Sequence, residues 1–295
     1  MVQNTMFASG NVTVKSQLGQ MQVVEYARDM SVSKLTAKIE YYCSKMNVNR
    51  RQLMLNLNGN AYTVQAGAMQ WMAGDIRMGT GIKGAGDFFG KLMGSAVTGE
   101  SAAKPVYEGF GQMMLEPTYR HILLTDLNEW NGSVVLDDGL FLACDAGVQQ
   151  KVVRRSNVSS AVLGGEGIFN LSLNGMGICA LESIVPREEI IEVILNNDCM
   201  KIDGNMAMAW SGTLDFTVEK STKTLIGSAV SGEGFVNVYR GSGKIWLAPV
   251  LSHGSAGQTN FSENASGGQT GTAAGKRGVM DKLDRFANFM GRFSE

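Results

Sequence analysis

Apolar and polar residues alternate with a period of two along much of the chain, the pattern of half-buried β-strands. The segment KLTAKIEYYCSK (34–45) follows this pattern and predicts a strand. Its apolar face would consist of Leu35, Ala37, Ile39, Tyr41 and Cys43.

Two further segments show the same alternation. RRQLMLNLNG (50–59) places Leu53, Leu55 and Leu57 on one face and ends at Asn58-Gly59, a pair that predicts a hairpin turn. MAMAWSGTLDFTVEK (206–220) predicts two successive strands. With 37 glycines and only 4 prolines, the composition also favours many short strands joined by glycine turns.

Two glycine patterns recur in the same order at intervals of about 65 to 72 residues. The first has glycine before an apolar strand, at Gly67, Gly139 and Gly204. The second has Gly-Glu, an extended segment, Gly-x-Gly and another apolar strand. It occurs at 99–111, 165–177 and 232–243. The recurrence predicts three repeated antiparallel β-units, in which Gly-x-Gly supplies a turn or bulge with positive φ.

The predicted organisation is a triplicated β-domain over 1–250, with repeats at about 10–115, 116–183 and 184–250. A polar Gly/Ser linker covers 251–275. The segment 276–295 predicts an amphipathic helix, because its apolar residues are spaced 4, 3, 4 and 3 apart. This stripe, the candidate contact site for a partner or membrane, consists of Val279, Leu283, Phe286, Met290 and Phe293.

The repeated motifs resemble one known family. They read VQAGAMQWMAGDI (64–76), YEGFGQMML (107–115), DGLFLACDAGVQQKV (138–152), GGEGIFNLSLNGMGICALES (164–183) and DGNMAMAW (203–210). In this order they are similar to the altered-inheritance-of-mitochondria protein (number twenty-four) family, a mitochondrial biogenesis family with bacterial members. The resemblance covers about residues 10 to 250.

The resemblance implies a fold like the tryptophan RNA-binding attenuation protein (TRAP-like): β-sandwich or double-stranded β-helix units, repeated in the chain. It also implies oligomers. No enzymatic activity or ligand is established for the family, so the resemblance transfers no site residue to this chain.

Charge, hydropathy and cysteine spacing limit which partners and which cellular compartment are expected. With 26 basic and 27 acidic residues the net charge is −1, so nucleic acid is not an expected partner. The N-terminus has no signal-peptide pattern, and no run of 18 apolar residues occurs. These features predict a cytoplasmic protein. The four cysteines lack CxxC spacing and are interpreted as small core residues rather than disulfide partners.

Candidate chemistry is sparse, and no catalytic, cofactor-binding or metal-binding residue is predicted. GTGIKG (79–84) matches GxGxxG but lacks the strand-to-helix context of a dinucleotide site. The chain has two histidines: His121, interpreted as structural in an apolar strand, and His253. The repeated acids Glu100, Glu166 and Glu233 favour a repeated structural role over catalysis.

Two apolar segments stand outside the strand pattern. Residues 87–97 predict a short helix or loop that covers a sheet edge or contacts another subunit. The helix at 276–295 has three alternatives: it packs on its own core or on other subunits, it binds a protein partner, or, ranked last, it lies on a membrane surface.

The leading functional hypothesis is therefore a non-enzymatic interaction or scaffold protein that forms a homo-oligomer and needs no cofactor. The alternative is a small-ligand or nucleic-acid binding module that uses clefts between β-units.

Overall fold

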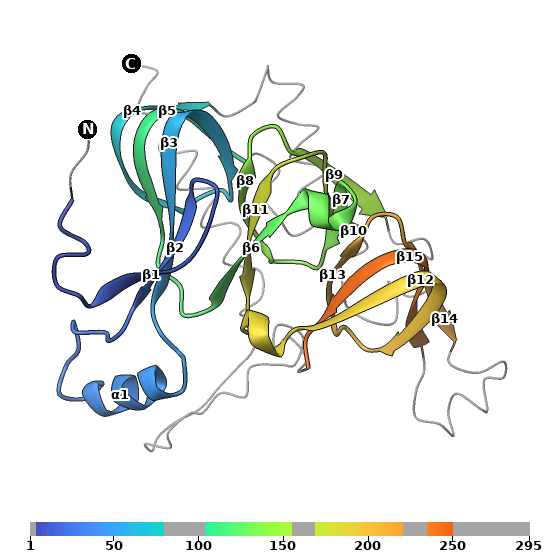
Figure 1. The fold of residues 1–295 in the computed structure, drawn as a ribbon. Helices are drawn as coiled ribbons and strands as arrows, with labels where there is room; N and C mark the ends of the chain where they lie inside the picture. Colours follow the sequence, from blue (N-terminus) through green and yellow to red (C-terminus); the bar gives the residue numbers. More distant parts are fainter. Residues whose placement is uncertain (1–3, 80–103, 155–168, 221–234, 250–295) are drawn as a thin grey trace, which may run out of the picture. The chain divides into compact units, whose positions relative to one another are not determined.

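The computed structural model describes residues 4–79, 104–154, 169–220 and 235–249. All belong to one compact unit, Met1–Ala256, whereas a second unit, Gly257–Glu295, falls outside these ranges. The described residues form fifteen strands, one α-helix (α1, Ala37–Lys45) and two short 3-10 helices, Leu127–Trp130 and Arg187–Glu189 (Figure 1). The prediction of a predominantly β fold is confirmed. None of these helices is long and apolar enough to span a bilayer.

The first sheet has eight strands, all paired antiparallel. Their order is β1-β2-β3-β8-β11-β6, with β5 also paired to β3 and β4 paired to β5. The strands are β1 (Val12–Leu18), β2 (Met21–Tyr26), β3 (Arg51–Val64), β4 (Met69–Gly79), β5 (Val106–Leu115), β6 (His121–Asp126), β8 (Phe141–Asp145) and β11 (Ile178–Ser183).

The second sheet has seven antiparallel strands in the order β12-β15-β13-β7-β10-β9, with β14 paired to β15. They are β7 (Ser133–Leu136), β9 (Gln149–Arg154), β10 (Phe169–Asn174), β12 (Ile191–Asp203), β13 (Ala207–Ser211), β14 (Asp215–Lys220) and β15 (Phe235–Leu247). The two strands predicted within 206–220 are therefore confirmed as β13 and β14.

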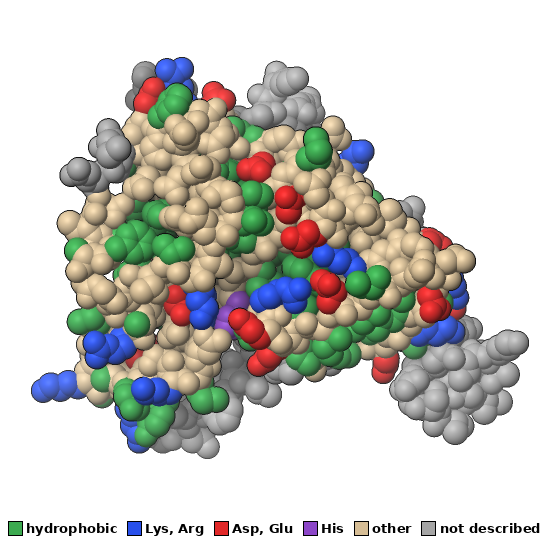
Figure 2. Space-filling model, in the orientation of Figure 1, with side chains coloured by type: hydrophobic (Ala, Val, Ile, Leu, Met, Phe, Trp, Pro, Cys, Tyr) green, Lys and Arg blue, Asp and Glu red, His purple; other side chains and the backbone are tan. Residues whose placement is uncertain are grey.

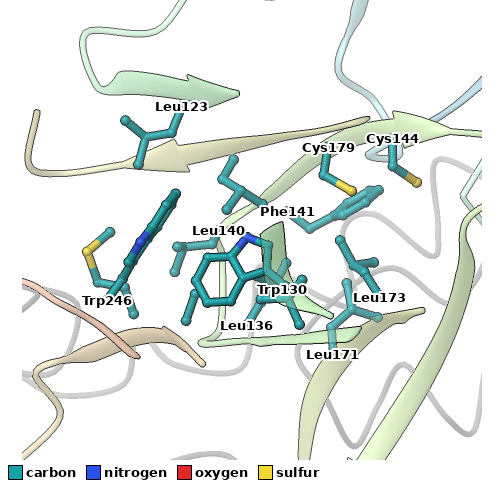
Figure 3. Close-up of a cluster of buried hydrophobic side chains, with 14 of the residues drawn as sticks. Leu123, Trp130, Leu136, Leu140, Phe141, Cys144, Leu171, Leu173, Cys179 and Trp246 are labelled. Carbon is teal, nitrogen blue, oxygen red and sulfur yellow. The ribbon is translucent and has the colours of Figure 1, made fainter. Parts of the chain in front are cut away.

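One hydrophobic cluster joins the two sheets. Leu123 and Phe141 come from the first sheet, and Leu136 and Trp246 come from the second. They pack with Trp130 of the first 3-10 helix, whose ring meets that of Trp246 edge to face (Figure 3). Since neither sheet could bury this apolar face alone, the cluster explains why both sheets are part of a single unit.

The Gly-x-Gly motif of 109–111 lies within β5, where the backbone of β4 approaches closely. Gly109 has φ 131°. A Cβ atom at Gly109 would lie 2.1 Å from the carbonyl oxygen of Asp75 on β4. The motif of 175–177 has a different position, between β10 of the second sheet and β11 of the first. The predicted positive φ is confirmed in both motifs, although the first is inside a strand rather than before one.

Replacing Gly109 with alanine should destabilise the fold. An alanine there would adopt a strained φ, which costs about 1–3 kcal/mol, and its Cβ would push β4 away from β5. Gly79 is the matched control, because its φ is ordinary and the nearest atom to an added Cβ is 4.0 Å away. Urea unfolding of G109A and G79A measures the difference. Equal stabilities for the two variants would contradict this role of Gly109.

The strand predicted over 34–45 is wrong, because residues 37–45 form α1. β2 and β3 pair directly with each other, and the helical segment between them pairs with no sheet edge. A helix satisfies its backbone hydrogen bonds internally and needs no such edge. The apolar residues of this segment also fit helical spacing, since Leu35, Ile39, Tyr42 and Met46 are 4, 3 and 4 residues apart.

The hairpin turn predicted at Asn58-Gly59 is also wrong. β3 runs through both residues to Val64, and the pairing of β3 with β5 shifts register between Asn58 and Ala61. Gly59 has φ 81°, so its left-handed conformation is used in a bulge rather than in a turn.

The four cysteines are all free, as predicted, but only two of them are core residues. Cys144 on β8 and Cys179 on β11 are buried partners in adjacent strands. A hydrogen bond with Cys144, together with burial, strongly raises the pKa of the Cys179 thiol, which disfavours the reactive thiolate. Cys43 is half-buried and Cys199 is exposed, so for Cys199 the core interpretation is wrong.

Candidate functional site

Among the residues that the structure describes, α1 and its flanks carry several of the most exposed apolar side chains. Leu35 is 90% exposed, Ile39 61% and Met46 77%, and no side chain of α1 is buried. Tyr42 lies on the same helical stripe, and Met30, which precedes the helix, is also exposed. We call Met30, Leu35, Ile39, Tyr42 and Met46 the α1 surface.

Polar contacts fix α1 to the first sheet. The Arg51 guanidinium on β3 donates from Nη2 to the backbone oxygen of Asn47 (2.9 Å) and to its side-chain Oδ1 (2.8 Å), directly after the helix. Before the helix, the hydroxyl of Tyr119 donates to Asp29 Oδ2 at 2.6 Å. This hydrogen bond to the Asp29 carboxylate raises the pKa of Tyr119 to about 12. The exposed stripe is therefore held in position from both ends.

Basic side chains lie along one side of the α1 surface. Lys34, Lys38 and Lys45 are all exposed, and the space-filling view shows hydrophobic and basic side chains together over this helix (Figure 2). Between residues 28 and 50 there are five basic and two acidic residues, a net charge of +3 in a chain whose total is −1. On a helical projection the three lysines lie along one flank of the apolar stripe. Apolar and cationic groups are thus combined on one element.

A second feature is a cavity of about 380 Å³ in the first sheet. It lies where the ends of β3 and β5 meet β8 and β11. Its lining residues are Gln65, Ala68, Glu116, Pro117, Thr118, Asp138, Gly139, Phe141, Leu142 and Glu182. We call it the acidic cleft, because three carboxylates contribute to its wall.

The acidic cleft has apolar as well as polar walls. The Lys104 ammonium lies 4.8 Å from the centre of the Phe141 ring, so one wall already accommodates a cation from the chain itself. Glu182 is hydrogen-bonded to the hydroxyl of Thr118. A smaller cavity shares Asp138 and Glu182 and continues to Asn205. The three carboxylates of the cleft would attract a small cationic ligand, whereas the Lys104 ammonium at the Phe141 ring would oppose one.

Two further titratable groups, His121 and Asp145, have pKa shifts with structural causes. Burial, and then the positive charge of Arg51, lower the pKa of His121 on β6. Burial raises the pKa of Asp145, although its carboxylate accepts a hydrogen bond from the backbone N–H of Ile178. Among the residues described, no group of three or more His, Cys, Asp or Glu side chains is arranged to hold a metal ion.

The comparisons with known proteins decide the family. The family model for mitochondrial biogenesis AIM24 matches residues 45–250. The chain belongs to the mitochondrial biogenesis AIM24 family. An uncharacterized protein of Streptococcus pyogenes serotype M6 is 31% identical over 198 residues, which are 64% of this chain and 77% of that protein. The crystal structure of a Streptococcus pyogenes protein is similar in fold, with a TM-score of 0.51 and 24% identity. That similarity covers 92% of this chain and 99% of the other.

The two candidate features differ in whether their residues fall within the region matched by the AIM24 family model. Residues lining the acidic cleft all lie within 45–250, so the cleft is built wholly from the family region. The first part of the α1 surface, from Met30 to Tyr42, precedes that region.

The residues that the sequence singled out as contact sites or for a repeated structural role fall outside the described ranges. This applies to the apolar stripe of 276–295, to the segment 87–97, and to Glu100, Glu166 and Glu233. The α1 surface was missed because its residues were interpreted as a strand. The 4, 3, 4 spacing of Leu35, Ile39, Tyr42 and Met46 is the signal that could have revealed it.

Proposed function

We propose that this protein is a non-enzymatic interaction protein that docks on its partner through the α1 surface. The observation that carries the proposal is an ordered helix with large apolar side chains in solvent and none in the core. Large exposed apolar patches are uncommon on monomeric soluble proteins, and where they occur they often mark interaction sites. The anchoring of α1 by Arg51 also supports it, because a fixed docking element loses less conformational entropy on binding.

The proposal also includes two features of the assembly. Each chain contains three repeated β-units in a TRAP-like arrangement, and several chains form a homo-oligomer that acts as a scaffold. Two observations support the repeat. The turns at Gly67, Gly139 and Gly204 have φ values of 79°, 79° and 69°. The strand pairs β4/β5, β9/β10 and β14/β15 are all antiparallel.

The docking proposal is tested with the variant L35S/I39S/M46S. A matched control is M176S/I191S/I194S, which removes three other exposed apolar side chains. Each tagged full-length protein is incubated with native lysate, and the bound protein and lipid are quantified after mild washing. The α1 variant should lose its associations by about tenfold or more, as expected for central contact residues, whereas the control keeps them.

Unchanged association of the α1 variant would overturn the proposal. Light scattering of the same purified proteins at micromolar concentration tests the assembly separately. A monomeric mass for the wild-type protein would refute the homo-oligomer without affecting the docking role.

The second candidate function is binding of a small ligand in the acidic cleft. The cavity of about 380 Å³, with an aromatic wall and carboxylates, favours a cationic small molecule over a nucleic acid, whose phosphates the carboxylates would repel. A screen of small amines by thermal shift tests it, with E116Q/E182Q as the variant. A stabilisation that the variant lacks would support the function, and equal shifts in both proteins would refute it.

A further inference from the structure

We infer that the partner of the α1 surface is the face of an anionic lipid bilayer. This inference rests on the proposed docking function and identifies its partner. It begins from the combination of an apolar stripe and one basic flank on a short helix. Amphipathic helices of this type lie in the interfacial plane, with apolar side chains among the acyl chains and lysines at the headgroups.

The arrangement of side chains fits this orientation. Leu35, Ile39 and Met46 are all largely exposed, and none of them lines either of the two cavities described above. Tyr41 and Tyr42 are both 58% exposed, and tyrosine is favoured at the boundary between acyl chains and headgroups. The Lys45 ammonium lies 5.5 Å from the centre of the Tyr41 ring, so a cation and an aromatic ring are already adjacent there.

Charge decides between a bilayer and the other occupants of this face. Residues 28–50 have a net charge of +3, which attracts anionic headgroups. A second copy docked through the same face would bring two such regions together. The segment 276–295, with five basic and three acidic residues, has a net charge of +2 and would also be repelled. An anionic surface alone among these three is complementary.

The experiment uses the full-length chain and sedimentation with vesicles, either pure phosphatidylcholine or phosphatidylcholine with phosphatidylglycerol. The wild-type protein should partition onto the anionic vesicles at low salt and less so as salt screens the lysines. Near an anionic surface each lysine contributes roughly fivefold, so K34Q/K38Q/K45Q should reduce the partition coefficient on the order of 100-fold.

The apolar contribution is measured with L35S/I39S/M46S against the control M176S/I191S/I194S. The first should lose binding by about tenfold or more, and the control should bind like the wild-type protein. All these side chains are exposed, so thermal unfolding should confirm that each variant remains folded.

Three outcomes would overturn the inference: no binding of the wild-type protein to anionic vesicles, binding that the α1 variants retain, or equal losses in the α1 and control variants. Retained binding would indicate contact through another surface, such as 276–295. If vesicles are not bound but the α1 variant still loses a protein partner in lysate, the lipid inference fails while the docking function stands.

Discussion

Replacing Trp130 with alanine should lower the free energy of unfolding by about 3–5 kcal/mol, the cost typical of removing a large buried aromatic side chain. Trp130 is fully buried in the cluster that joins the two sheets. Its ring centre lies 4.8 Å from that of Trp246, and its Nε1–H donates to the hydroxyl of Thr125 at 2.8 Å. The variant therefore leaves both a cavity and a buried hydroxyl without its donor.

The stability lost in W130A should also include an electrostatic contribution, because a charged side chain packs on the Trp130 ring. The Lys244 ammonium lies 4.4 Å from the centre of the Trp130 ring and 3.6 to 3.7 Å from the carboxylates of Glu129 and Glu192. The hydrogen bond from Trp246, followed by the charge of Lys244, lowers the pKa of Glu192. Removing the Trp130 ring takes away one contact of the Lys244 ammonium, so the ion pairs of Lys244 with Glu129 and Glu192 should rearrange.

Urea unfolding followed by far-UV circular dichroism measures the loss for W130A. The matched control is W71A, because Trp71 on β4 is only partly buried at the edge of a smaller cluster. We expect W71A to lose less stability than W130A. A loss at Trp130 no greater than that at Trp71 would contradict the importance of this junction.

Replacing Glu25 with alanine should be similarly costly, about 3–5 kcal/mol, because it leaves a buried guanidinium unpaired. The Arg51 side chain is only 3% exposed, and its Nε and Nη2 both lie 2.7 Å from Glu25 Oε2. Since Arg51 also holds Asn47, the change should loosen the attachment of α1.

The control for this prediction is E219A, which breaks an ion pair with Arg240 on the surface of the second sheet. Exposed ion pairs contribute little, so E219A should leave the free energy of unfolding nearly unchanged. The double variant E25M/R51M should recover part of the loss of E25A, because it removes the buried charge as well. Equal stabilities for E25A and E219A would contradict the prediction.

Local sequence patterns predicted several of the strands correctly. Alternation identified the region of β3 and both β13 and β14, and glycine spacing identified positions with positive φ, such as Gly109 and Gly177. These features depend on the pleat of a strand and on the conformational range of glycine, which are local properties. The same logic excluded neither a bulge at Gly59 nor a helix at 37–45, because each pattern fits two local structures.

The candidate sites were less predictable. The acidic cleft combines Gln65, Glu116, Asp138 and Glu182, which come from four separate parts of the chain and meet only through strand pairing. The α1 surface depends on which residues remain uncovered after folding, and the spacing of apolar residues alone does not distinguish a buried stripe from an exposed one.

The sequence by itself determined that the chain folds mainly as β-structure and belongs to the AIM24 family, because alternation and ordered glycine motifs are encoded over short distances. Only the tertiary structure decided that residues 37–45 form a helix and that its apolar side chains stay in solvent. The reason is that β2 and β3 pair with each other and so leave their connection outside the sheet. Whether a segment finds a hydrogen-bonding edge or an apolar face to cover depends on the packing of the whole chain.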